Sequence, residues 1–419
     1  MPKIKTITAR EILDSRGNPT VEAKIGLDNG IIAKASVPSG ASGAEESCDL
    51  RDGDKKRYAG MGVLKAVKNV EEKIAPALIG TEITEQEKID RLMIELDGTK
   101  NKNKLGANGM LAVSLACARA GALSENSELF SYLGKIFNLG KPGLPVPCFN
   151  LFNGGVHADT NLDFEEFVII PQGKIKEKGM AEMVRMGAEI FHELGRVLKE
   201  ARYDTDVGLE GGYAPDIHSS IQAIELIIAS GIRSGFKPGA DFGIGIDVGS
   251  GKLYNRENGK YVFKLDNASF TSMTLAGLYY EWFRKYPLIY LEDGLAEDDL
   301  AGWKDLNKLL GGEIMLVGDD LFKTDTRRLR EGLAEKAANA LTIKPSQAGT
   351  LTEAVECAKL AKKHNLKTVV SHRSGETNDD FIADLAYALG VDYIKAGSLS
   401  RGERVAKYNR LMEIEILVS

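Results

Sequence analysis

The sequence predicts an α/β protein in which a small N-terminal α+β domain precedes a larger, modified (β/α)8 barrel. From residue 242 onward, short apolar runs typical of buried parallel strands alternate with helix-length segments. Residues 1–40 follow a different, alternating pattern, and a cluster of proline and glycine at residues 140–147 separates the two. Because such clusters interrupt helices and central strands, we place the boundary there, giving domains 1–139 and 140–419.

The N-terminal domain is expected to combine an antiparallel sheet with helices. Residues 20–27 alternate, Asp28-Asn29-Gly30 supplies a hairpin turn, and residues 31–37 return. Apolar residues at three- and four-residue spacing predict helices within 63–74, 86–96 and 111–123. Between sheet and helices, the small residues of segment 38–44 indicate either a linker or a mobile lid, since closing lids need residues that absorb backbone changes.

The barrel strands share one feature, which is a charged residue at or just after the C-terminal end of the apolar run. In a closed parallel barrel these ends face one rim, so the charges would converge on one site. The alternative is that each charge only marks where a strand leaves the core. The residues concerned are Asp247, Glu292, Asp319, Lys344, His372, Arg373 and Lys395.

The acidic members of this set have the chemistry of a magnesium site. Asp247, Glu292 and Asp319 offer only oxygen ligands, which hard divalent cations prefer, and the set lacks the histidine or cysteine typical of zinc. A lysine close to a cation and to another lysine is expected to have a lowered pKa and to act as a base, which applies to Lys344 and Lys395.

The basic members suggest what the substrate carries. His372-Arg373-Ser374 offers several donors to a phosphate or carboxylate group. A metal, a base and an anion site together indicate removal of a proton beside a substrate carboxylate. A Schiff-base aldolase built on Lys344 or Lys395 is the competing class, but it needs no three-carboxylate cluster.

Two further loops offer candidate site residues. His157 follows a glycine turn and precedes Glu165 and Glu166 at the mouth of an apolar run, although an isolated histidine is often structural. Glu210 lies in the glycine-supported loop 209–215, which otherwise reads as a plain turn. Between them, residues 180–203 predict a long amphipathic helix.

Composition favours a cytoplasmic enzyme with a small substrate. The 419 residues carry a net charge of −6 without a long basic run, so we expect no nucleic-acid surface. The four cysteines lie far apart, which argues against a disulfide framework or a structural zinc site. Neither a targeting segment nor a membrane-spanning run is indicated.

Several motifs together resemble those of the enolase family, and the resemblance runs nearly end to end. They are the segments 9–22, 50–54, 153–158, 210–215, 318–321, 371–377 and 397–401. The resemblance implies a three-stranded sheet with helices, followed by a barrel whose first strands depart from regular β/α alternation. It also implies reversible dehydration of 2-phosphoglycerate to phosphoenolpyruvate in glycolysis and gluconeogenesis.

The resemblance further implies a role for each matching residue. Asp247, Glu292 and Asp319 would bind a first Mg²⁺, and Ser39 would join a second Mg²⁺ when substrate is present. Lys344 would be the base, and Lys395 and the metals would stabilise the charged intermediate. Enolase-superfamily sites in general combine a lysine or histidine base with one or two Mg²⁺ ions. Glu210, helped by Glu166, would protonate the departing hydroxyl. The expected substrate contacts are Ser39, His157, Glu165, Glu166, Lys344, His372, Arg373, Ser374 and Lys395.

Four features depart from the family pattern. Glu165 stands where a glutamine is usual, Leu209 where an aspartate precedes the acid, and Ser346 where an asparagine follows the base, while the Ser39 loop is shorter. These changes leave open an enolase-like paralogue that has reduced activity, uses another carboxylate substrate or acts as a binding protein. The resemblance also implies a homodimer or an octamer, and allows a surface or secreted pool beside the cytoplasmic one.

Overall fold

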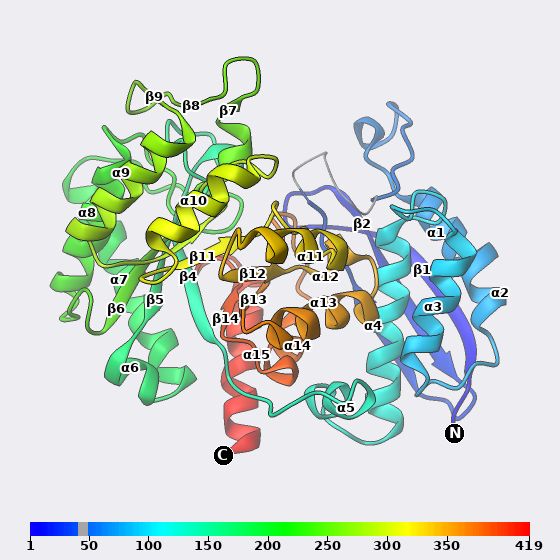
Figure 1. Ribbon diagram of the computed structural model, residues 1–419. Coiled ribbons are helices and arrows are strands. Elements are labelled where there is room, and N and C mark those ends of the chain that lie inside the picture. Colours follow the sequence, from blue (N-terminus) through cyan, green and yellow to red (C-terminus); the bar gives the residue numbers. More distant parts are fainter. Residues whose placement is uncertain (41–48) are drawn as a thin grey trace.

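The computed structural model describes residues 1–40 and 49–419, and shows a small N-terminal part lying beside a large barrel (Figure 1). The N-terminal sheet has three antiparallel strands in the order β1–β2–β3. The predicted hairpin is confirmed, and its turn ends at Gly30, whose φ of 88° is one that glycine adopts without strain. The strands are β1 (Ile4–Leu13), β2 (Pro19–Leu27) and β3 (Ile32–Ser36).

Helices of the N-terminal part pack on this sheet, as the apolar spacing predicts. The most deeply buried is α4, which contacts β2 and β3 and also reaches α12 of the barrel part. The helix expected over residues 63–74 changes to π-helical geometry at Val70–Ile74 and then continues. The helices are α1 (Leu64–Asn69), α2 (Ala75–Leu78), α3 (Gln86–Asp97), α4 (Ala107–Ser124) and α5 (Leu129–Ile136), with a 3₁₀ turn at Tyr58–Gly60.

The second part is a closed barrel with the strand order β10-β11-β12-β13-β14-β4-β5-β6. The predicted apolar runs all form strands of this barrel, and their side chains are almost entirely buried. The strands are β4 (Val146–Asn153), β5 (Glu166–Pro171), β6 (Phe242–Asp247), β10 (Leu288–Glu292), β11 (Met315–Gly318), β12 (Ala340–Ile343), β13 (Lys367–Ser371) and β14 (Tyr393–Lys395).

One barrel strand runs against the others. β5 pairs antiparallel with both β4 and β6, whereas the remaining pairs are parallel. Its first residue, Glu166, is therefore opposite Asn153 and Asp247, the last residues of its two neighbours. The reversal places the N-terminal end of β5 at the rim where the other strands end, and it confirms the expected departure from regular β/α alternation.

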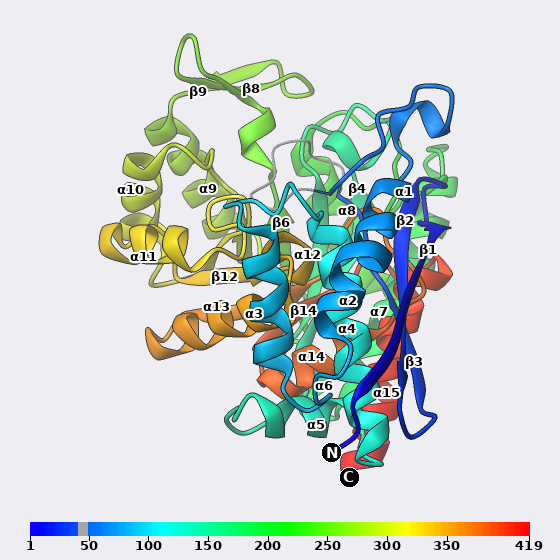
Figure 2. The same ribbon diagram turned by 90° about the vertical axis from the view of Figure 1, so that its right-hand side faces the viewer.

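Helices surround the barrel, and a small sheet of β7 (Tyr254–Asn255), β8 (Lys260–Phe263) and β9 (Ala268–Phe270) projects beyond it (Figures 1 and 2). The long helix predicted over residues 180–203 is α7. Two 3₁₀ turns cover Gly155–His157 and Ser250–Lys252. The helices are α6 (Gly173–Glu177), α7 (Met180–Glu200), α8 (Ser220–Arg233), α9 (Ser272–Lys285), α10 (Leu300–Leu310), α11 (Thr326–Glu335), α12 (Pro345–Ala348), α13 (Leu351–Lys363), α14 (Phe381–Leu389) and α15 (Gly402–Val418).

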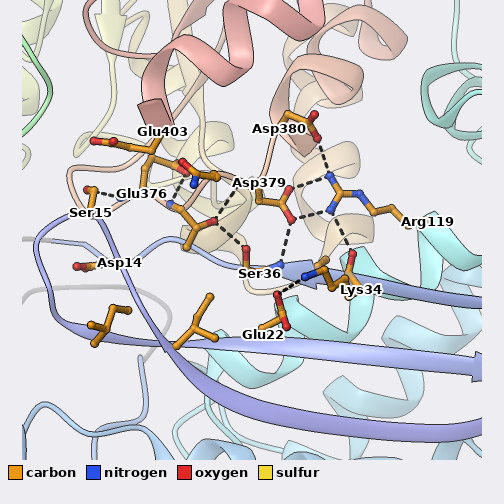
Figure 3. Close-up of a pocket in the computed structure, with 15 residues that line it drawn as sticks. Asp14, Ser15, Glu22, Lys34, Ser36, Arg119, Glu376, Asp379, Asp380 and Glu403 are labelled. Carbon is orange, nitrogen blue, oxygen red and sulfur yellow. Dashed lines mark hydrogen bonds and ion pairs between the residues drawn. The ribbon is translucent and has the colours of Figure 1, made fainter. Parts of the chain in front are cut away.

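Polar contacts join the N-terminal part to the barrel. Asp90 of α3 accepts hydrogen bonds from the backbone N–H (2.9 Å) and hydroxyl (2.6 Å) of Thr352, at the start of α13. Figure 3 shows a second contact zone, where Arg119 bonds Asp379 and Asp380 beside a cavity of about 530 Å³. Because both sets cross the junction, the sheet domain holds the loops of the barrel in place.

The structure also bears on the predicted domain boundary, the predicted lid, the cysteines and the absence of a membrane-spanning segment. The predicted boundary lies between α5 and β4, although Pro147 is already the second residue of β4. Ser39 and Gly40 of the predicted lid are described, while its residues 41–44 lie outside the described residues. Cys117, Cys148 and Cys357 are buried and free. Among the described residues, every helix is too short or too polar to span a membrane.

Candidate active site

Most of the predicted site residues surround one cavity of about 60 Å³ at the rim where the parallel strands end. Glu292 is buried just below this lining, and Ser39 lies to one side of it. Many of the charged and polar residues of the lining were predicted from strand ends and loops that are far apart in the chain, whereas Lys252, Asp293, Asp320, Gln347 and Ser371 also line it and were not predicted. Those that line the cavity are His157, Glu165, Glu166, Glu210, Asp247, Asp319, Lys344, His372, Arg373, Ser374 and Lys395.

One side of the cavity, here called the lysine–carboxylate side, consists of Asp247, Glu292, Asp319, Lys344 and Lys395. The Lys395 ammonium donates to Asp247 (2.7 Å) and Glu292 (2.8 Å). It also lies 3.1 Å from Glu166. Burial by itself would lower the pKa of Lys395, but these carboxylates raise it well above its usual value. The ammonium therefore holds three strand ends together as a permanent positive charge.

Lys344 forms the second ion pair on this side, with Asp319. Burial again acts to lower the pKa of Lys344, yet attraction to Asp319 outweighs it and the pKa is raised. The expectation of a lowered lysine pKa refers to a site that holds a cation, so it stays a prediction. The strand-end pattern places each lysine near another positive charge, but it does not show that a carboxylate of a neighbouring strand lies closer.

The carboxylates of this side fit a hard divalent cation. Burial, followed by repulsion from Asp247, raises the pKa of Glu292 to about 7, so this group needs positive charge nearby to ionise. The hydroxyl groups of Tyr290 and Thr342 already donate to Glu292 and orient it. All three carboxylates offer only oxygen atoms, the ligand type that Mg²⁺ prefers, although here Lys395 bonds Asp247 and Glu292 while Lys344 pairs with Asp319. Asp247, Glu292 and Asp319 are the residues that would hold it.

The opposite side, here called the histidine side, consists of His157, Glu166, Glu210 and His372. The ligand atoms of His157, Glu166 and Glu210 lie within 4.8 Å of one another, so these residues form a group able to hold a cation; among the described residues, Asp247, Glu292 and Asp319 do not form such a close group. His157 Nδ1 is 3.5 Å from Glu210 and 3.9 Å from Glu166. The glycine turn before His157 and the reversed strand β5 bring these groups together.

The two glutamates of the histidine side differ in protonation. Burial, followed by repulsion from Glu210, raises the pKa of Glu166 well above its usual value. Burial acts in the same direction on Glu210, but attraction to His157 and to the guanidinium of Arg404 lowers its pKa well below that value. The pKa values of the two glutamates are therefore displaced in opposite directions, and Glu166 holds a proton more strongly than Glu210 does.

Some buried polar atoms of the histidine side have no hydrogen-bond partner among the described residues. They are His157 Nδ1, Glu166 Oε2 and His372 Nε2, and all three residues line the cavity. His372 Nε2 lies 3.6 Å from Glu210, beyond a hydrogen bond. Because a buried polar atom without a partner is costly, these atoms are the ones a bound polar ligand would satisfy.

The predicted anion-binding residues border the same cavity. Arg373 donates to the Ser346 hydroxyl at 3.1 Å, and the Ser374 hydroxyl accepts a bond from Arg16 at 3.5 Å. Ser39 pairs through its backbone with Gly375, while its own hydroxyl donates to Asp14 at 2.6 Å. Ser39 thus lies next to the loop that carries the predicted anion-binding residues Arg373 and Ser374, but it does not line the cavity. Its role as a metal ligand stays a prediction.

Sequence reasoning missed several residues that contact the site. Gln347 donates to Asp319 at 3.4 Å, Asn150 donates to Glu210 at 3.3 Å, and Arg404 bonds His372. Gln347 could have been found because it follows Lys344 by three residues on a short helix. Asn150 is a polar residue inside an apolar strand, which is also a signal. The sequence pattern around Arg404 gives no signal that its side chain contacts the site.

Comparison with protein families agrees with this arrangement. Residues 4–133 match the model described as the enolase N-terminal domain, and residues 141–419 match the enolase C-terminal TIM barrel domain. The chain belongs to the enolase family. Its domain architecture is that of a lyase of the enolase superfamily. The exact domain boundary at 139/140 stays a prediction.

Within this enolase-family site, the departures from the family pattern have physical consequences. Burial raises the pKa of Glu165 to about 7, so the extra carboxylate is only partly charged at neutral pH. Leu209 acts through its backbone, since its N–H donates to the backbone carbonyl of His157 and its own carbonyl accepts from the Arg404 guanidinium. Ser346 supplies the hydroxyl that orients Arg373.

Proposed function

We propose that this member of the enolase family catalyses the Mg²⁺-dependent, reversible dehydration of 2-phosphoglycerate to phosphoenolpyruvate. The observation that supports it most is the division of one cavity into two chemically different sides. Lysine–carboxylate ion pairs lie on one side, and two glutamates whose pKa values are displaced in opposite directions lie on the other. A reaction that removes a proton at one carbon and a hydroxyl at the next needs this division.

The anionic groups of the substrate would be bound by the basic residues of the cavity. Arg373, with the Ser374 hydroxyl beside it, offers a guanidinium suited to a phosphate group. Lys395 offers its ammonium to the substrate carboxylate. His157, His372 and Glu166 would then use their unpartnered atoms to bind the region of the departing hydroxyl.

Proton removal from C2 is assigned to Lys344. The amine must first leave its contact with Asp319 and be deprotonated, after which it takes the C2 proton. The electron pair of the C2–H bond is first taken up by the substrate carboxylate, and in a second step it forms the C2–C3 double bond as the C3–O bond breaks. Glu210, recharged by Glu166, gives a proton to the leaving hydroxyl, which departs as water.

The metal ions belong to the lysine–carboxylate side. Asp247, Glu292 and Asp319 would hold the first Mg²⁺, and Ser39 would contribute to a second one. When bound, Mg²⁺ supplies positive charge that stabilises the additional negative charge on the substrate carboxylate. Lys395 adds a positive charge of the protein at the same place.

The test is formation of phosphoenolpyruvate from 2-phosphoglycerate, followed by ultraviolet absorbance with and without Mg²⁺. We expect turnover with Mg²⁺, none in excess chelator, and recovery when Mg²⁺ is restored. Asp319→Ala should lose most activity, whereas Asp298→Ala, which changes an exposed carboxylate, should not. Full activity in chelator would refute the metal assignment, and no product under any condition would favour a paralogue with another substrate.

Cell biology and assembly follow from the same proposal. An enzyme with this activity would act in glycolysis and gluconeogenesis in the cytoplasm. We propose a homodimer or an octamer as its assembly, which light scattering distinguishes from a monomer and from each other.

A further inference from the structure

Arg404, near the start of α15, lies beneath the cavity with no exposed surface. Its guanidinium connects the two loops that carry the site. It donates to the carbonyls of Arg373 (2.7 Å) and Ser374 (2.6 Å) in the loop after β13, and to the carbonyl of Leu209 (3.0 Å) in the loop that carries Glu210. Its remaining close partner is the ring of His372, whose Nδ1 lies 2.6 Å away.

The contact with His372 fixes where the ring carries its proton. A guanidinium has only N–H donors, so Nδ1 of His372 must be the acceptor and cannot bear a proton. A neutral imidazole then carries its proton on Nε2. The other tautomer would set two donors against each other at 2.6 Å inside the protein.

The Nε2 atom faces the proton-transferring groups. It is buried, has no hydrogen-bond partner among the described residues, and lies 3.6 Å from the Glu210 carboxylate. Burial lowers the pKa of His372 well below its usual value, and the positive charges of Arg404, Lys395 and Lys344 act in the same direction against the attraction of Glu210. The ring is therefore a neutral donor, and not an imidazolium.

We propose that Arg404 is a positioning residue that holds His372 as the neutral Nε2–H tautomer, with its single donor directed toward Glu210 and the departing hydroxyl. Its role in turnover rests on the proposed function, whereas the tautomer itself does not. Because the same guanidinium binds Leu209 and Ser374, it also fixes the position of the Glu210 loop relative to the loop that carries Arg373 and Ser374. Arg404 touches no reacting atom.

Nitrogen NMR of the histidine rings tests the tautomer directly in the whole, unliganded protein. The chain has 5 histidines, and a His372→Gln variant identifies the signals of His372 by their loss. We expect a proton bound to Nε2 and an unprotonated Nδ1 across the neutral pH range. A proton on Nδ1, or on both nitrogens, would overturn the proposal, whether or not the protein makes phosphoenolpyruvate.

Substitutions at Arg404 test whether the tautomer matters for the reaction. Arg404→Met keeps much of the side-chain volume but removes every donor, so the Nδ1–H tautomer should appear. Arg404→Lys keeps a donor and should preserve the Nε2–H tautomer and more of the activity. The control is Arg410→Met on the same helix, which loses ion pairs with Asp384 and Glu128 but does not contact His372.

The kinetic readout separates positioning from general damage. In Arg404→Met we expect product formation to fall on the order of 100-fold, the loss typical of misplaced catalytic groups, while exchange of the C2 proton with heavy water falls much less. Equal loss of both, with the wild-type tautomer retained, would refute the positioning role. If Arg404→Met does not fold, the wild-type spectrum and Arg404→Lys still decide the proposal. An inactive wild-type protein with the expected spectrum would refute only the proposed function.

Discussion

The two sides of the cavity are built differently. On the lysine–carboxylate side, Lys344 and Lys395 each contact a carboxylate of another barrel strand, and the charges nearly balance. On the histidine side, buried atoms of His157, Glu166 and His372 have no partner among the described residues. The first side is satisfied within the protein, whereas the second is left with hydrogen-bonding capacity that a ligand can use.

This contrast separates two requirements of the proposed reaction. Charge stabilisation needs a group whose position and charge do not change, and Lys395, bonded to Asp247 and Glu292, provides it, whereas Lys344 on the same side must leave its ion pair to act as the base. Proton delivery needs groups that can gain and lose a proton, and the Glu166–Glu210 pair has pKa values displaced in opposite directions. The following substitutions, from the largest expected effect to the smallest, test whether the two requirements are truly separate.

The largest effect is expected on the lysine–carboxylate side, from Lys344→Ala. Removing the base should abolish both exchange of the C2 proton with heavy water and formation of phosphoenolpyruvate, by about 100- to 10,000-fold. Lys308→Ala, an exposed lysine of α10, is the control and should leave both rates unchanged. Exchange at the wild-type rate in Lys344→Ala would assign the base to another group and remove the proposed division.

A smaller and more selective effect is expected on the histidine side, from Glu210→Gln. The amide cannot deliver a proton to the hydroxyl, so product formation should fall by about 100-fold or more, while C2 exchange continues because Lys344 is intact. The paired measurement is exchange by NMR and product by absorbance, with the exposed Glu313→Gln as control. Normal product formation would show that Glu166 delivers the proton without Glu210.

The smallest effect is expected from Glu165→Gln, at the border of the histidine side. With a pKa of about 7, Glu165 is mostly neutral below that pH and mostly ionised above it, where its charge repels an anionic substrate. The KM of the wild type relative to the variant should therefore rise with pH, by roughly two- to fivefold. The ratio cancels the titration of the substrate itself. A ratio that is constant across this range would mean that Glu165 does not act on the bound anion.

The strand ends of the barrel could be predicted because each depends on a short local pattern. An apolar run followed by Asp247, Glu292 or Lys344 specifies a buried strand and a charged residue at its end, and barrel closure brings such ends together. The hairpin and helices of the N-terminal part follow from equally local periodicity. The family resemblance added that the first barrel strands depart from regular β/α alternation, which no periodicity indicates, and the structure shows that the departure is the reversal of β5.

Properties that depend on neighbours in space could not be predicted in this way. The pKa values of Lys344 and Lys395 are raised because carboxylates of other strands lie nearest, and sequence spacing does not report that distance. Asn150 interrupts an apolar strand, but the interruption alone does not show that its partner is Glu210, 60 residues away, and the pattern around Arg404 gives no signal. The pKa values of Glu166 and Glu210 likewise depend on the contact between the start of β5 and the loop that carries Glu210.

The reversed strand β5 has a consequence for how the chain folds. Strands β4, β5 and β6 follow one another as an antiparallel meander, so Asn153, Glu166 and Asp247 can meet through pairing of successive strands. Lys395 reaches Asp247 from 148 residues further along the chain, when β14 pairs with β4 and closes the ring. Closure of the barrel is therefore what brings the Lys395 ammonium to Glu166, Asp247 and Glu292, whose mutual repulsion it offsets.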